Sequence, residues 1–225
     1  MFLFVDGCVS YSSPPPSTPT GMVYQTFPKP TSQAIRLVIG DGGLLSGEPC
    51  GPPCFWDIYP GKTTKDEAQE ILTRRGFIDY CKTFESFQYV VDREVETGGW
   101  ACRIGFGFEF DIDFIKDVGI VNFIRFEPEK RLMLQDVIGK FGSPKFIDIF
   151  NTGSENHPSQ TLWATIYYPD QMFMLSVVSK NGLTYPIEPT TVINHVIYQD
   201  AQLFETTFAL AGDDFYPWKG YGDYP

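Results

Sequence analysis

The fold is decided by residues 47–76, which read GEPCGPPCFWDIYPGKTTKDEAQEILTRRG. Two cysteines flank a Gly-Pro-Pro turn, and an aromatic pair and a Pro-Gly turn follow. Thr64 and Glu67 have the spacing of a capping box, in which each residue satisfies the backbone N–H of the other. Gly76 suits the left-handed position that ends a helix. The stretch therefore predicts an amphipathic helix between Thr64 and Gly76, with its apolar stripe on a sheet.

The rest of the chain favours strands. The 225 residues include 20 Phe and 12 Tyr, together with 21 Gly and 18 Pro. Short segments rich in aromatic and β-branched residues alternate with turns over residues 86–126 and 145–198. Gly98-Gly99 reads as one of the hairpin turns. We therefore predict an α+β fold with roughly eight antiparallel strands.

A weaker copy of the helical pattern recurs later in the chain. Leu134, Val137 and Phe141 have helical spacing, and Gly142-Ser143-Pro144 ends the segment. Aligning this helix with the first also aligns Phe146-Ile147 with Phe77-Ile78 without a gap. The pattern predicts two tandem helix-plus-antiparallel-sheet units forming one curved sheet with short helices packed against it: residues 31–127, and residues 128–225 with an aromatic C-terminal tail that packs on the sheet.

The N-terminal residues 1–30 read as an anchor and a linker. A short apolar run ends at Gly7-Cys8, and residues rich in Ser, Thr and Pro follow. This order is typical of a bacterial lipoprotein, in which the cysteine receives the lipid and a polar tether follows. Asp6 and the lack of a preceding Lys or Arg depart from that pattern. The alternative is a disordered N-terminus with a stray thiol at Cys8.

The chain has five cysteines. If Cys8 carries lipid, an even number remains, as expected of an exported domain. Cys50 and Cys54 are close enough for a local bridge, and Cys81 and Cys102 could be partners across two strands. Four cysteines allow three connectivities, so these pairings are hypotheses. A zinc site of four thiolates is the rival, although it usually has two C-x-x-C pairs that this chain lacks.

Charge and motifs exclude several classes. A formal charge of −11 and a pI near 4.6 argue against nucleic acid and against adhesion to anionic lipid. No apolar run is long enough for a membrane-spanning helix. Gly61-Lys62-Thr63 lacks the earlier glycine of a phosphate-binding loop, because Trp56 stands there. We predict no catalytic residue, cofactor or metal, and we assign His157 and His195 structural or solvated roles.

Two groups of residues remain as candidates for binding. Glu109, Asp111 and Asp113 alternate along one strand and would share a face, where paired carboxylates could serve a glycosidase or bind calcium. An alternating strand must also expose something polar, and that is the simpler interpretation. The tryptophans and tyrosines suit a protein-binding surface, because such residues dominate interface hot spots. The residues predicted to contact a partner are Trp56, Trp100 and Trp163.

The order of the motifs resembles that of a known superfamily. Residues 49–64, PCGPPCFWDIYPGKTT, are similar to the Pro-Cys-x-Pro-Pro-Cys-Trp and Pro-Gly-x-Thr-Thr signature of uncharacterised bacterial lipoproteins. More broadly, the chain resembles the β-lactamase-inhibitor-protein-like and SmpA/OmlA-like (BamE-like) superfamily over residues 47–200. It departs from the pattern by inserting Phe55 and by placing Met133 where a capping Thr or Ser is expected. The resemblance implies this α+β fold and export.

These observations predict a lipid-anchored or exported protein of the bacterial cell envelope. We expect a non-catalytic interaction module that binds an envelope or extracellular protein of unknown identity and touches the membrane only through an N-terminal lipid. The alternative is a secreted enzyme, or a binder of a small ligand or metal, that uses the acidic strand face.

Overall fold

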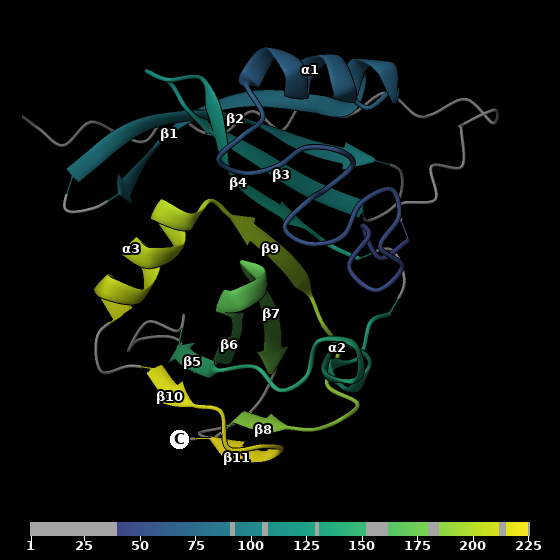
Figure 1. Cartoon of the computed structure of the whole chain (residues 1–225), viewed down its shortest axis with the longest axis vertical. Coiled ribbons are helices and arrows are strands. Elements are labelled where there is room, and N and C mark those ends of the chain that lie inside the picture. Colours follow the sequence, from purple (N-terminus) through teal and green to yellow (C-terminus); the bar gives the residue numbers. More distant parts are fainter. Residues whose placement is uncertain are drawn as a thin grey trace, which may run out of the picture. The chain divides into compact units, whose positions relative to one another are not determined.

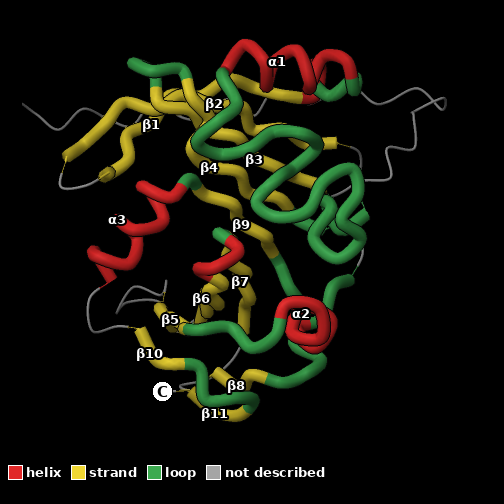
Figure 2. Tube along the Cα trace, in the orientation of Figure 1, coloured by secondary structure: helices red, strands yellow, loops and turns green. Residues whose placement is uncertain are grey.

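A computed structural model describes residues 40–90, 93–104, 108–128, 131–151, 162–179, 185–211 and 215–224. Three α-helices lie in these ranges: α1 (Lys65–Arg74), α2 (Leu134–Phe141) and α3 (Ala201–Ala211). Two short 3-10 turns are η1 (Ile78–Tyr80) and η2 (Pro169–Gln171). Figure 1 shows the elements in order, and Figure 2 shows helices, strands and loops separately.

The strands form one large and one small antiparallel sheet. The large sheet has nine strands: β1 (Cys81–Val90), β2 (Arg93–Ile104), β3 (Phe108–Ile115), β4 (Ile120–Phe126), β5 (Phe146–Asn151), β6 (Leu162–Tyr168), β7 (Phe173–Ser179), β9 (His195–Gln199) and β10 (Phe215–Pro217). The small sheet pairs β8 (Tyr185–Ile187) with β11 (Gly222–Tyr224). The prediction of an α+β fold with a large antiparallel sheet is confirmed.

The order of strands in the large sheet is β1-β2-β3-β4-β9-β7-β6-β5-β10. Strands β1 to β4 pair in chain order, and so do β5 to β7. Strand β9 pairs with both β7 and β4 and joins the two halves, and β10 pairs with β5 at the far edge. Residues Arg36–Pro225 make one compact unit. The boundary predicted near residue 128 therefore falls inside that unit.

Helix α1 begins with the predicted capping box. The Thr64 hydroxyl accepts from the Glu67 N–H at 3.3 Å, and the Glu67 carboxylate accepts from the Thr64 N–H at 2.8 Å. Ala68 and Leu72 form its buried stripe. In α2 the Met133 thioether supplies no cap to the helix, and only the Asp136 carboxylate accepts from the Met133 N–H, at 3.3 Å. Both predicted helices are confirmed.

The same pair of backbone hydrogen bonds joins each of these helices to the sheet. The Lys65 N–H donates to the Gly119 carbonyl at 2.7 Å. The Val121 N–H donates to the Thr63 carbonyl at 2.9 Å. The equivalent bonds at α2 run from Leu134 to Thr191 and from Ile193 to Leu132. Each helix start is thus fixed to a strand-like segment that begins the last strand of its half.

An aromatic stack fills the space between the sheet and residues 47–76. The rings of Phe55 and Trp56 are stacked with their centroids 4.2 Å apart, and the rings of Trp56 and Phe77 are stacked at the same centroid distance, 4.2 Å. Phe55 also stacks on Phe126 of β4 at 4.6 Å, and Phe110 of β3 touches Phe55 and Trp56 at 5.5 and 5.6 Å. All five rings are at most 5% exposed. Burial on this scale makes the stack a principal part of the core.

A two-residue turn presents the first two rings to the stack. Phe55 and Ile58 exchange both backbone hydrogen bonds, at 3.0 and 2.9 Å. Trp56 and Asp57 between them are left-handed, with φ of 53° and 70°. This conformation costs roughly 1–2 kcal/mol per residue for an L side chain, so ring burial must offset it. The prediction that Trp56 contacts a partner is therefore wrong, because this side chain is 5% exposed and lies in the core.

Helix α3 covers part of the opposite face of the sheet, and no helix was predicted there. Phe204 and Phe208 pack against Tyr167 and Met174 in a second, smaller apolar cluster. The Asp200 carboxylate starts the helix by accepting from the Leu203 N–H at 2.8 Å. The sequence AQLFETTFALA has apolar residues all round, which obscures a helical stripe.

The aromatic tail, predicted to pack on the sheet, instead extends one sheet and forms part of another. Strand β10 pairs with β5, and β11 pairs with β8. Tyr224 is 1% exposed, and the ring of Trp218 stacks on it at 5.9 Å. Tyr224 therefore belongs to the core and Trp218 packs against it, whereas Tyr216 and Tyr221 remain exposed.

We expect the Trp56→Ala variant to lose about 3–5 kcal/mol of unfolding free energy, because a buried aromatic ring leaves a cavity in the stack. Trp163→Ala, which changes a half-buried ring outside the stack, should cost about 1 kcal/mol or less. Urea unfolding followed by circular dichroism measures both. Equal losses in the two variants would contradict the central role of the stack.

Candidate functional site on the open face of the sheet

Side chains of one sheet face point away from α1 and α2, and α3 is the only described helix that packs on this side. We call the part of this face that the described helices leave uncovered the open face; its residues are Ala101, Glu109, Asp111, Arg125, Phe150, Trp163, Val178 and His195. The strand registers place these residues together, because Ala101 is opposite Asp111, Asp111 opposite Arg125, and Trp163 opposite both Val178 and Phe150. The open face crosses the sheet from β2 to β5 (Figure 1).

An aromatic group occupies the part of the open face formed by the second half of the chain. The rings of Trp163 and His195 are stacked, with centroids 6.1 Å apart. Phe150 lies beside Trp163 and is 42% exposed. Trp163 is thus the one member of the predicted tryptophan set that reaches the surface. Apolar rings on an uncovered sheet are the residues that dominate protein interfaces.

Trp100, the third predicted contact residue, does not lie on the open face. It is 4% exposed and packs against Phe114 at 5.2 Å on the helix-bearing face. Its position in β2 is directly opposite Ile112, which is also buried. The period-2 alternation of β2 therefore directs Trp100 into the core and Ala101 to the open face.

His195 carries little positive charge at neutral pH. Burial lowers the pKa of its imidazole, and the nearby Arg125 lowers it further, while Asp111 and Glu109 act in the opposite direction. Its Nε2 lies 3.4 Å from the Glu127 carboxylate, and the two groups form an ion pair only when the imidazole is protonated. We take the neutral form as the one that prevails at pH 7, because burial is the largest cause.

The carboxylates of the open face are already paired. Arg125 donates to Asp111 from both Nε and Nη2, and Arg103 forms an ion pair with Glu109. Among the described residues, the only group of three ligand atoms within 4.8 Å is Cys50, Cys54 and Asp57. The acidic strand therefore does not assemble a cluster of metal ligands within the described part of the chain.

Asp113 follows the same alternation but is buried under the first strand. It is 7% exposed, and its Oδ2 accepts from the Gln88 side chain at 2.9 Å. The Gln88 oxygen in turn accepts from Asn122 at 2.8 Å. Burial, followed by the nearby Asp111, raises the pKa of the Asp113 carboxyl to about 7. Its Oδ1 has no hydrogen-bond partner among the described residues, which suits a carboxyl that keeps its proton.

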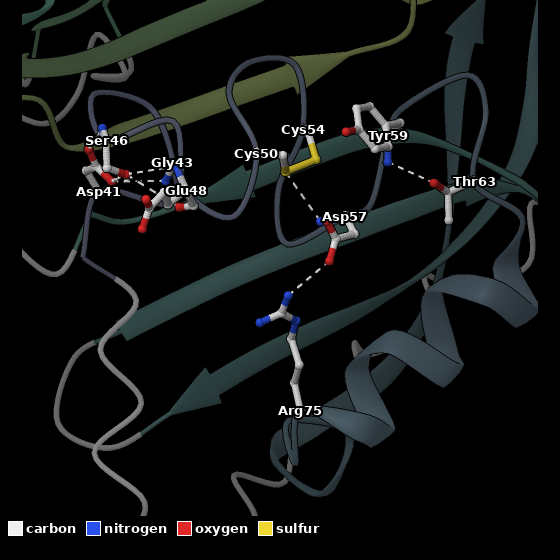
Figure 3. The surroundings of a disulfide bond; sticks show 10 residues. All are labelled: Asp41, Gly43, Ser46, Glu48, Cys50, Cys54, Asp57, Tyr59, Thr63 and Arg75. Atoms are coloured by element: carbon white, nitrogen blue, oxygen red, sulfur yellow. Dashed lines mark hydrogen bonds and ion pairs between the residues drawn. A yellow bond between two sulfur atoms is a disulfide. The ribbon is translucent and has the colours of Figure 1, made fainter.

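Both predicted disulfides are present. Cys50 and Cys54 are bridged with Cα atoms 5.7 Å apart, and Cys81 and Cys102 are bridged between directly opposite positions of β1 and β2. In Figure 3 the first bridge lies beside Asp57, whose N–H donates to Cys50 Sγ at 3.4 Å and whose carboxylate pairs with Arg75 at 3.1 Å. With four cysteines in disulfides, the rival site of four zinc thiolates does not form in this structure.

Two predicted residues lie outside the described part of the chain: the lipidation candidate Cys8 and the loop histidine His157. In the described part, none of the helices has the length and apolar character needed to cross a membrane. Comparison with protein-family models, with curated proteins and with solved structures finds no match to this chain.

The raised pKa of Asp113 predicts a pH-dependent stability. Since the folded-state pKa is about 7 and an unfolded Asp titrates near 3.9, the fold favours the protonated carboxyl. This contribution is complete below about pH 4 and disappears as the pH rises through about 7. Relative to Asp113→Asn, the wild-type protein should lose a few kcal/mol of unfolding free energy between pH 4 and pH 8. Urea unfolding of both proteins across this range measures the difference, and a constant difference would contradict the assignment.

Proposed function

We propose that this chain is an exported, lipid-anchored protein of the bacterial envelope that binds a protein partner through the open face. The observation that carries the proposal is the Trp163–His195 stack beside the exposed Phe150, on a sheet face left uncovered by the described helices. Interfaces place such aromatic side chains at their centre and polar groups at the rim.

The charges of the open face fit the rim of an interface. Arg103 with Glu109 and Arg125 with Asp111 give balanced pairs on the neighbouring strands β2, β3 and β4. Balanced pairs contribute little to affinity when they stay solvated, but they select a partner of matching charge pattern. Their mutual neutralisation also leaves no unpaired carboxylate for acid–base chemistry at Glu109 or Asp111. This supports a binding role rather than catalysis.

Export is supported by the two disulfides. Bridges of this kind persist in oxidising compartments and are rare in the cytosol of most organisms. Cys8, after a short apolar run, is the candidate for the lipid, and the Ser/Thr/Pro-rich residues after it have the composition of a tether. A single lipid-bearing N-terminus would hold the domain at the membrane surface and leave the sheet free for a partner.

We also infer that the sheet is one curved surface built from two tandem units. Each unit would contain a helix followed by four strands, β1 to β4 in the first and β5, β6, β7 and β9 in the second. The matched pairs of hydrogen bonds at Thr63–Lys65 and Leu132–Leu134 support this division. In such an arrangement the open face is a continuous surface contributed by both units.

The partner can be sought by site-specific photo-crosslinking in the native host. We expect benzoylphenylalanine at position 150, 163 or 101 to capture the same protein. Tyr59 and Val118, which are exposed at 36% and 63% but lie outside the open face, serve as control positions. Equal capture from the control positions, or none from the open face, would contradict the proposal.

The anchor predicts a specific covalent change. The mature protein should begin at Cys8 with added lipid mass and should sediment with membranes, whereas Cys8→Ser should be released from them. Intact mass spectrometry and membrane fractionation of both forms test this. An unprocessed wild-type chain in the soluble fraction would refute lipidation at Cys8.

A further inference from the structure

A groove lies on the helix-bearing face, away from the open face. It has a volume of about 690 Å³ and runs between α1 and the strands β1 and β2. Trp100, Phe114 and Gly98 contribute apolar surface to it, and Lys65 and Lys116 contribute ammonium groups. In Figure 1 helix α1 lies along this edge of the sheet.

Strand β1 forms one wall of the groove and is also the edge of the sheet. It pairs with β2 alone among the described strands. Edge strands usually carry a proline, a bulge or a short length that prevents further pairing. The ten residues CKTFESFQYV contain no proline, and their register with β2 has no bulge. The two charged residues of β1, Lys82 and Glu85, are the only edge-protecting feature of this kind in the strand. The opposite edge, β10, has three residues and ends at Pro217.

The register shows which backbone groups of β1 face outward. Cys81 and Cys102 are directly opposite, and their Cα atoms are 4.0 Å apart, which is the close spacing of a non-hydrogen-bonded pair. The alternate residue Phe84 agrees with this register, because its carbonyl oxygen points toward β2. It lies 3.6 Å from the position that a Cβ atom would take at Gly98 of β2. The backbone N–H and C=O groups of Thr83, Glu85 and Phe87 therefore point away from β2.

The same residues direct their side chains toward the groove. Cys81, Thr83 and Glu85 line it, and Phe87 continues this row with 60% of its surface exposed. A strand added to β1 would place every second side chain on this side. The outward backbone groups and the groove thus form one continuous site for an extended chain.

The charged side chains of the groove indicate which kind of polypeptide segment would fit it. Lys65 has no carboxylate partner among the described residues, and its Nζ lies 4.9 Å from the ring centre of Phe114. Lys116, which also lines the groove, is shared between Glu85 at 2.9 Å and Glu96 at 3.5 Å. Because no described carboxylate pairs with it, the ammonium of Lys65 favours an acidic side chain next to apolar ones. The net charge of −11 opposes pairing of two copies of this chain.

We propose that β1 accepts an extended segment of another polypeptide as an additional strand, with apolar side chains in the groove and an acidic side chain at Lys65. This site uses a different face from the proposed open-face interface and does not depend on it. Main-chain hydrogen bonds would supply affinity, and the groove would supply specificity.

Two blocked, fluorescein-labelled heptapeptides test the proposal: Thr-Val-Thr-Leu-Thr-Glu-Thr and its reverse, Thr-Glu-Thr-Leu-Thr-Val-Thr. Each places three alternating side chains on one side, and together they cover both strand directions. We expect one of them to bind the full chain in fluorescence anisotropy. N-methylation of the peptide amides that face β1 should weaken binding at least about tenfold, the equivalent of roughly one hydrogen bond.

Two protein variants locate the site. Thr83→Pro removes an outward N–H without removing a β1–β2 hydrogen bond, and it should also weaken binding at least about tenfold. Lys65→Glu should reverse the preference between the Glu peptide and its Lys analogue, whereas Lys62→Glu, a matched change outside the groove, should not. Because peptide N-methylation leaves the protein unchanged, it tests the edge even if Thr83→Pro does not fold.

Three results would overturn the proposal. The first is that neither peptide binds the wild-type chain. The second is that binding is insensitive both to N-methylation and to Lys65→Glu. The third is a wild-type dimer in sedimentation that Thr83→Pro dissociates, which would make a second copy the occupant. Trp163→Ala should leave peptide binding unchanged, so the outcome is separate from that of the open-face interface.

Discussion

The stack of Phe55, Trp56, Phe77, Phe110 and Phe126 is the interaction on which the rest of the structure depends. It joins the disulfide-bearing turn, the end of α1 and the central strands β3 and β4 in one set of ring contacts. The left-handed backbone at Trp56 and Asp57 persists because these rings are buried. The bridge between Cys50 and Cys54 holds the same turn from the other side.

Placing this apolar surface on one face has a consequence for the other. With α1, α2 and residues 47–76 on the helix-bearing face, the opposite face needs only α3 and its smaller cluster at Tyr167 and Met174. The remainder keeps exposed aromatic rings and balanced ion pairs, which is the composition of a recognition surface. One face of the sheet therefore holds most of the core, and this leaves the other face available for the proposed function.

Local patterns predicted much of this fold. Thr64 and Glu67 marked the start of α1, and the Cys spacing suggested both bridges. The burial of individual side chains was harder to predict from the sequence. Trp56, Trp100 and Trp163 are the same residue type, and only the register of each strand or turn decides which of them is in the core. The prediction of a turn at Gly98-Gly99 is wrong, because both residues lie inside β2. Glycine is needed there because the rings of Phe114 and Phe84 occupy the space that a Cβ atom would take. No motif indicated His195 or Arg125 as part of the open face, because their strands meet only through long-range pairing.

The most direct test of the account is hydroxyl-radical footprinting of the protein in intact envelopes and in purified form. If a partner covers the open face, Phe150 and Trp163 should be oxidised more slowly in the envelope than in the purified protein. Tyr59 should be oxidised equally in both, and the buried rings of Trp56 and Trp100 should be protected throughout. Equal oxidation of Phe150 and Trp163 in the two preparations would contradict a partner on the open face.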